Sequence, residues 1–144
     1  VWAIADRRAS KTAASRALIS EFKKMPDDDP ELHQYKGRIG GTLDVIADDD
    51  IVDDLIDIVK TPKYKKSRAF LLLVLGRMRD PRAVDTLILL LGDEDPLVAG
   101  RAVAVLRGAR IARALPAIEP LIAHHDPRVR EEARKALKAR RIRA

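Results

Sequence analysis

Six aspartates stand close together in residues 47–57, ADDDIVDDLID, and clustered carboxylates are the ligands that hard cations such as Ca²⁺ prefer. Asp50, Asp53, Asp54 and Asp57 recur at intervals of three and four residues, so they share one face of a helix, opposite its apolar residues. No glycine-turned ligand loop accompanies them. The spacing therefore predicts a solvated acidic helix face, which also offers a docking surface to a basic partner.

Two adjacent histidines, His124 and His125, are the next residues with metal-binding chemistry. Neighbours on a helix point about 100° apart, so these two rings cannot chelate one metal together. No third histidine or carboxylate stands at ligand spacing from them. We expect the pair to end a helix, and we expect the protein to bind no metal and no cofactor.

Sequence signatures of catalysis are missing from the chain. It has no G-x-S-x-G motif, no phosphate-cradling glycine loop and no paired carboxylates in an apolar setting. It has no cysteine, which excludes disulfides, thiolate metal sites and a cysteine nucleophile, and suits a reducing cytoplasm. Apolar runs such as residues 69–75 are far shorter than the ~20 residues of a membrane span. We expect a cytoplasmic, non-enzymatic protein that does not span a membrane.

Arginines give the clearest pattern among the charged residues. Residues 99–144 hold 12 Lys and Arg against 4 Asp and Glu, so the positive charge is concentrated in this part. Six arginines fall at two corresponding turns: Arg77, Arg79 and Arg82 at the first, Arg107, Arg110 and Arg113 at the second. Since stacked helices lie about 8–10 Å apart, we expect these six to form an arginine ridge along one edge of the molecule.

Further basic side chains are expected on the inner surface of the fold. They are Arg101, Arg130, Arg134 and Lys138, with Lys63, Lys65, Lys66 and Arg68 earlier in the chain. Glu131 and Glu132 offset part of this positive charge. Two interpretations stay open: the basic residues bind an acidic partner, or they only keep exposed turns soluble.

The elements that must position these residues repeat along the chain. Residues 75–106 and 106–137 share ten identities at an offset of 31, among them Asp95/Asp126 and Pro96/Pro127, and a fixed period of this length is typical of a solenoid. The recurring Asp-Pro predicts a helix start, because the carboxylate accepts from free backbone N–H groups and proline fits the first helical position. Low aromatic content (3%) and abundant aliphatic residues also favour helices.

The pattern predicts an all-α fold, a right-handed α-solenoid of about four helical pairs. We expect one domain over residues 1–144, with divergent N-terminal helices in 1–48 and three repeats of about 31 residues in 49–144. The first helix should cover residues 3–24, with Ala14, Leu18, Ile19 and Phe22 facing inward. Gly40 and Gly41 should interrupt a helix between Pro30 and Ala47, and Pro62 should open the helix that ends at Gly76.

The motifs DPRAVDTLILLL (80–91) and DEDPLVAGRAVAVL (93–106) resemble HEAT repeats of the short type found in phycobilisome-lyase-like proteins. In that type one helix starts Asp-Pro-x-Ala-Val and the next starts Asp-Pro-x-Val-Arg. Residues 126–137, DPRVREEARKAL, match the second pattern, including Arg130. Ala99 and Gly100 depart from it, which interrupts a regular arginine ladder. The resemblance is good over about 75–140 and weaker over 50–75.

The resemblance implies a non-catalytic scaffold whose second helices line a concave surface. We expect a protein partner with an acidic surface, bound on this concave face or at the arginine ridge. The alternative is backbone-type nucleic-acid binding by the basic C-terminal repeats. A lyase-type accessory role is the third interpretation, and it would require a bound chromophore.

Overall fold

The structure is a computed structural model that describes residues 2–143, with side chains from residue 3 to residue 139. Eight α-helices follow one another in this part of the chain. They are α1 (Trp2–Lys24), α2 (Pro30–Ile46), α3 (Val52–Val59), α4 (Ala69–Gly76), α5 (Pro81–Leu89), α6 (Pro96–Gly108), α7 (Leu115–Ile118) and α8 (Pro127–Arg143). Short 3₁₀ segments join them: η1 (Asp49–Ile51), η2 (Pro62–Arg68), η3 (Leu90–Gly92), η4 (Ala112–Ala114) and η5 (Glu119–Ala123). The predicted all-α fold is confirmed.

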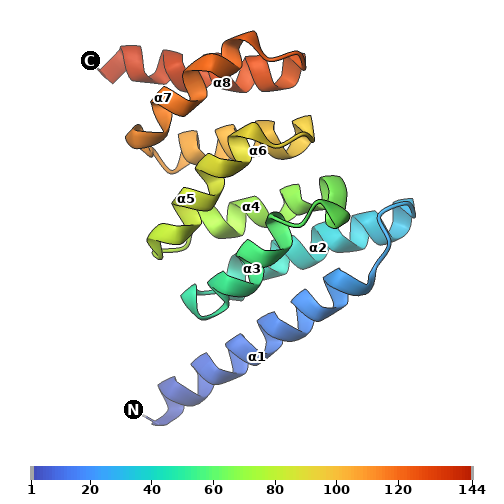
Figure 1. Cartoon of the computed structure of the whole chain (residues 1–144). Coiled ribbons are helices and arrows are strands. Elements are labelled where there is room, and N and C mark those ends of the chain that lie inside the picture. Colours follow the sequence, from blue (N-terminus) through green and yellow to red (C-terminus); the bar gives the residue numbers. More distant parts are fainter. Residues whose placement is uncertain (1, 144) are drawn as a thin grey trace.

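The helices form two layers (Figure 1). The second helix of each pair, α2, α4, α6 and α8, stacks on the next in one layer. The first helices cross them at an angle in the other layer. This stacking is the α-solenoid arrangement that the repeat predicts, and it is consistent with the HEAT type that the sequence resembles. Its right-handed sense and the division at residue 48 stay predictions.

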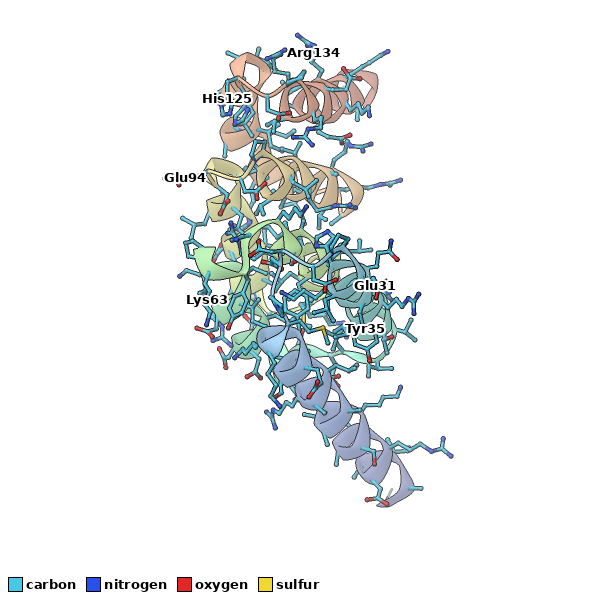
Figure 2. The ribbon with its side chains drawn as sticks, turned by 90° about the vertical axis from the view of Figure 1, so that its right-hand side faces the viewer. Glu31, Tyr35, Lys63, Glu94, His125 and Arg134 are labelled. Atoms are coloured by element: carbon cyan, nitrogen blue, oxygen red, sulfur yellow. The ribbon has the colours of Figure 1, made fainter. Side chains whose placement is uncertain are left out.

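The 31-residue period is visible in three dimensions. Lys63, Glu94 and His125 are successive positions at this offset, and Figure 2 shows them above one another along one edge. Glu31 and Tyr35 of α2 lie on the opposite side of this view. A residue at one position of a repeat therefore has its counterpart directly beside it in the next repeat.

The Asp-Pro dipeptides start helices as predicted. The carboxylates of Asp80 and Asp95 accept hydrogen bonds of 2.9 Å from the backbone N–H of Arg82 and Leu97, respectively. Asp126 accepts in the same way from the N–H of Arg128, at 2.8 Å. These carboxylates satisfy N–H groups that have no partner within their helices.

Glycine plays a different part in α2 from the one expected. The helix runs without interruption through Gly40 and Gly41. A Cβ atom at Gly40 would lie 2.7 Å from the backbone oxygen of Phe70, so glycine here permits the close approach of α2 and α4. Gly41 has no atom within 4 Å of its missing Cβ and faces solvent.

Two further predictions on the helices need correction. Pro62 opens a 3₁₀ segment instead of an α-helix, and α4 begins only at Ala69, because Lys65 has non-helical dihedral angles (φ 43°, ψ −139°). In α1, Ile19 and Phe22 are buried and Leu18 is half-buried, but Ala14 is exposed and Ser15 is buried in its place.

One continuous apolar core joins the layers. Each pair contributes large buried side chains, including Phe22 from α1, Leu43 from α2, Leu72 from α4 and Leu106 from α6. Within the described residues, no helix combines the length and the apolar character that a membrane span requires.

Substituting alanine at Gly40 and at Gly41 should have opposite effects on stability. Gly40→Ala places a Cβ against a backbone oxygen and should lower the free energy of unfolding by about 1–3 kcal/mol. Gly41→Ala, its neighbour in solvent, should raise it by about 0.4–1 kcal/mol because alanine restricts the unfolded chain and favours helix. Urea denaturation of both variants measures the difference; equal effects would contradict the close packing of α2 on α4.

Candidate functional site

The acidic segment of residues 47–57 contacts the basic side of α1. Arg8 donates to both carboxylate oxygens of Asp50, at 3.0 and 2.9 Å, and Thr12 donates to the same carboxylate at 3.2 Å. Farther along α1, Arg16 lies 3.8 Å from Asp54. The basic partner expected for this acidic face is thus, in this structure, the first helix of the same chain.

These contacts also shift the pKa values of Asp50 and Arg8. The hydrogen bonds from the Arg8 guanidinium lower the pKa of Asp50 below its ordinary value and raise that of Arg8. The arginines are largely exposed and the carboxylates partly exposed, so each ion pair contributes little in water and is screened by salt.

Four of the six ridge arginines are neutralised by carboxylates of neighbouring helices. The contacts link Arg77 with Asp44 (3.0 Å), Arg82 with Asp53 (2.6 Å), Arg107 with Glu132 (3.2 Å) and Arg113 with Asp85 (2.8 Å). Each pair joins helices that lie next to each other in one layer. These ion pairs link neighbouring repeats, and the ridge therefore carries less free charge than the sequence indicates.

Arg79 and Arg110 differ from the other ridge arginines. Both side chains are exposed, and neither guanidinium makes an ion pair or a hydrogen bond within the described part of the chain. The backbone N–H of Arg79 donates to the Asp49 carboxylate at 2.9 Å. These two residues are the part of the ridge that stays available to a partner.

Some of the remaining basic side chains are exposed to solvent, and others form hydrogen bonds within the chain. Arg101, Arg134 and Lys138 are exposed. Arg130 is half-buried and donates to the backbone oxygens of His124 and His125, at 2.7 and 2.9 Å, so it caps the preceding 3₁₀ segment.

Arg68 does not contribute to the inner surface as expected. It is buried and binds both carboxylate oxygens of Asp93, at 2.6 and 2.9 Å. It also donates to the backbone oxygens of Val59 and Lys65. This guanidinium thus holds together the turns that precede α4 and α6. By contrast, Lys63, Lys65 and Lys66 are exposed, and Lys65 is paired with Asp28 at 3.0 Å.

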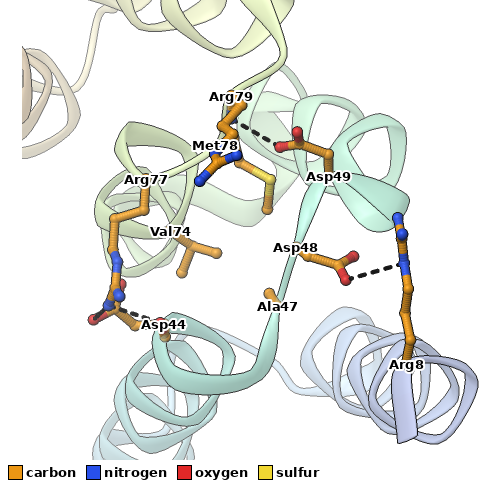
Figure 3. Close-up of a pocket in the computed structure, with 9 residues that line it drawn as sticks. All are labelled: Arg8, Asp44, Ala47, Asp48, Asp49, Val74, Arg77, Met78 and Arg79. Atoms are coloured by element: carbon orange, nitrogen blue, oxygen red, sulfur yellow. Dashed lines mark hydrogen bonds and ion pairs between the residues drawn. The ribbon is translucent and has the colours of Figure 1, made fainter. Parts of the chain in front are cut away.

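A cleft of about 420 Å³ opens beside the arginine ridge (Figure 3). Its charges are mixed: the lining residues are Arg8, Asp44, Ala47, Asp48, Asp49, Val74, Arg77, Met78 and Arg79. Arg77 is bound to Asp44, and Arg8 lies 3.7 Å from Asp48. The carboxylates balance the guanidinium groups, so the cleft is not a preformed anion site.

A buried polar cluster, which we call the Lys36 cluster, was not foreseen from the sequence. Lys36 has 1% of its side chain exposed, and its Nζ lies 2.6 Å from Asp27, which is 4% exposed. The ammonium also lies 4.8 Å from the centre of the Phe22 ring. Ser67 donates a short hydrogen bond to the same Asp27 oxygen, and His33 Nδ1 lies 3.2 Å from Ser67 Oγ. Nothing in the spacing of these residues signals that they meet, because they come from a loop, a helix and a 3₁₀ segment.

The Lys36 cluster contains Ser, His and Asp but not in a catalytic order. In a nucleophilic triad, histidine accepts the serine proton. Here the Ser67 hydroxyl donates to Asp27, so Nδ1 of His33 must be the donor to Ser67. Ser67 is also fully buried. The hydrogen bonds of the cluster therefore connect α2 and the loop before it with the 3₁₀ segment that precedes α4.

The paired histidines do not form a metal site. Their rings stack with centroids 4.2 Å apart, and His124 has extended dihedral angles at the end of η5, as expected for a helix end. Within the described residues no group of three His, Cys, Asp or Glu side chains has a metal-binding arrangement.

The second-helix layer exposes an outer face on the side away from the first helices. We define it by positions that share one side of their helices and, in α4 and α6, correspond at the 31-residue offset: Arg38 and Val45, Phe70 and Leu73, Arg101 and Ala104. Leu73 is 49% exposed and Val45 is 77% exposed. Arg38 and Arg101 make no ion pair in the described part of the chain. The face thus combines apolar surface with unpaired positive charge.

The C-terminal repeats match a known repeat family. A family model of HEAT repeats matches residues 84–142, which covers α6, α7 and most of α5 and α8. The match does not assign these repeats to the phycobilisome-lyase-like type. Comparisons with curated proteins and with solved structures give no significant match. HEAT repeats generally mediate protein–protein interaction or scaffolding and are typically non-catalytic.

Removing the charge of Asp27 should destabilise the protein strongly. Asp27→Asn leaves the Lys36 ammonium buried without a counter-charge, and breaking such a pair costs about 3–5 kcal/mol. The matched control is Asp28→Asn, which breaks an exposed pair with Lys65 and should cost at most about 1 kcal/mol. Urea denaturation measures both; equal small losses would show that the buried pair does not hold the fold.

Acid should loosen the N-terminal half of α1. The pKa of Asp50 is lower in the folded protein than its ordinary value of 3.8, so its pairing with Arg8 contributes fully above that value and is lost as the pH falls through the lowered one. Hydrogen-exchange protection of residues 5–16, corrected for intrinsic rates, should therefore be constant above about pH 5 and fall as the pH is lowered below 3.8. In Arg8→Gln the protection should be weaker at neutral pH and change less; identical profiles would exclude this contact as the cause.

Proposed function

Since this HEAT-repeat chain carries its matched repeats over residues 84–142, we propose that it is a non-catalytic protein-binding module. Its partner lies across the outer face of the second helices and reaches the arginine ridge at their C-terminal ends. The partner is a protein with an acidic surface. The fold supplies a rigid support, and the exposed side chains of one layer supply the contacts.

The exposed Leu73 is the observation that carries this proposal. A leucine in the middle of an α-helix is normally turned to the core, but α4 already buries Leu71, Leu72 and Leu75 on its other sides. At the corresponding position the next repeat has Ala104. An exposed leucine in a helical layer that also carries Arg38 and Arg101 has the composition of a binding hot spot with a charged surround.

The ion pairs of the first-helix layer also favour the outer face as the binding surface. There, Arg82 is bound to Asp53 and Arg113 to Asp85, so the charges of the first helices are used in stacking. On the outer face, Arg38 and Arg101 have no such partners in the described part of the chain. An incoming acidic protein therefore meets uncompensated positive charge on this face.

Backbone-type nucleic-acid binding is the second candidate, favoured by the concentration of Lys and Arg in residues 99–144. Against it, the ion pairs of Arg107 and Arg113 remove part of that charge. Binding to a labelled random DNA duplex at roughly 50 and 200 mM salt separates the two, because phosphate contacts lose affinity by orders of magnitude over this range.

A charge on the outer face should abolish partner binding. Leu73→Asp should reduce retention of the partner at least about tenfold, since it removes an apolar anchor and repels an acidic surface. The matched control is Leu89→Asp, an equally polar change at a leucine that is 60% exposed on α5, in the other layer. Immobilised variants are incubated with nuclease-treated lysate from the source organism, and the retained proteins are quantified by mass spectrometry. If every retained protein tolerates Leu73→Asp as well as Leu89→Asp, the outer face is not the binding surface.

A further inference from the structure

Arg79 and Arg110 occupy the same position in successive repeats, 31 residues apart. Each follows the C-terminal end of a second helix, α4 or α6, and these two helices pack directly on each other. Both side chains are exposed, whereas the four other ridge arginines bind carboxylates. The result is two guanidinium groups without an ion pair in the described part of the chain, at turns that follow two stacked helices whose axes lie about 8–10 Å apart.

The backbone at Arg110 is one that normally belongs to glycine. Arg110 has φ 59°, and α6 ends there with two hydrogen bonds of 3.0 Å, from Arg110 N–H to the Arg107 oxygen and from Ile111 N–H to the Leu106 oxygen. These bonds define a Schellman motif, in which the left-handed position favours glycine. Arg110 therefore adopts a conformation that is strained for a residue with a side chain, and its guanidinium makes no hydrogen bond or ion pair in the described part of the chain.

We propose that Arg79 and Arg110 bind two carboxylates of one acidic protein segment, set about one repeat apart. This inference rests on the proposed function and specifies the chemistry of the partner where it crosses the arginine ridge. Guanidinium groups bind carboxylates through paired, directional hydrogen bonds, so two of them in fixed register select both charge and spacing.

Discrete carboxylates fit this edge better than a phosphate backbone does. Asp49, Asp53 and Asp85 are bound to or beside the ridge and would repel a continuous line of phosphates. An acidic protein segment can place a carboxylate on each free arginine and uncharged residues between them. The helix spacing of about 8–10 Å is close to the rise of about 10.5 Å that separates residues i and i+7 on one face of an α-helix.

The probe is a fluorescein-labelled, alanine-based helical peptide with Glu at i and i+7 and Leu between them on the same face. Its twin carries Lys at both Glu positions. Fluorescence anisotropy at about 50 mM salt should show the Glu peptide bound at least about tenfold tighter than the Lys twin. The Nε–H signals of Arg79 and Arg110 should shift in NMR spectra during titration with the Glu peptide.

The variant R79Q/R110Q should lose about tenfold in affinity for the Glu peptide. Its matched control is R82Q/R113Q, which removes the same charge from the same edge at the same 31-residue spacing, but from arginines that are already paired. The control should bind within about twofold of the unaltered protein. Circular dichroism and urea denaturation confirm that each variant is folded.

Arg110→Gly separates a binding role from a structural one. If Arg110 serves only to complement the negative end of the α6 helix dipole, removing it lowers the urea midpoint and leaves peptide affinity unchanged. The proposal requires the reverse: glycine relieves the left-handed backbone and raises the midpoint, while affinity for the Glu peptide falls.

Three results would overturn the proposal: no preference for Glu over Lys peptide, equal losses in R79Q/R110Q and R82Q/R113Q, or tighter binding of duplex DNA than of the Glu peptide at both salt concentrations. These leave the proposed function standing if Leu73→Asp still abolishes retention of a protein partner. If a partner no longer binds Leu73→Asp but binds R79Q/R110Q normally, its binding surface is the outer face alone. Arg79 and Arg110 are then not part of it.

Discussion

Close stacking of the second helices is the constraint on which the rest of the structure depends. A repeat of two short helices cannot bury its apolar face alone, so each must be covered by its neighbour. Gly40 lets α2 approach the backbone of α4, and Gly76 does the same between α4 and α6, where a Cβ would lie 2.3 Å from the Val105 side chain. The core between the layers is built mainly from Leu, Ile, Val and Ala side chains, and these fill the space that the close stacking leaves.

This stacking decides what the charged residues do. Once neighbouring helices lie in contact, carboxylates of one repeat come within ion-pair distance of arginines in the next, as for Arg113 and Asp85 or Arg82 and Asp53. Such exposed pairs contribute little stability individually, but they cancel charge on the surface where they form. The acidic segment and the basic α1 cancel each other in the same way. The free charge that a partner meets is what remains after this internal pairing.

Buried ion pairs connect the helices and turns at the other ends of the helices. Lys36 and Asp27 join α2 to the loop before it, and Arg68 and Asp93 join the turns before α4 and α6. Removing a charge from the interior is costly when its partner remains, so these pairs favour one arrangement of the turns over alternatives. They explain why the irregular segment around Lys65, with its non-helical backbone, is held in place between two helices.

The sequence by itself determined the helical class, the repeat and the helix starts, because these depend on local spacing. Asp80, Asp95 and Asp126 bind backbone N–H groups only two residues away, and apolar intervals of three and four residues specify which side of a helix is buried. Only the tertiary structure decided which arginines are free. Arg79 and Arg82 look equivalent in the chain, but Arg82 binds Asp53, 29 residues earlier, whereas the Arg79 side chain binds no carboxylate among the residues that the structure describes. It also decided that Lys36 is buried and that α2 continues through Gly40. The reason is physical: pairing, burial and close approach depend on distances between segments remote in sequence, which are set when the helices stack.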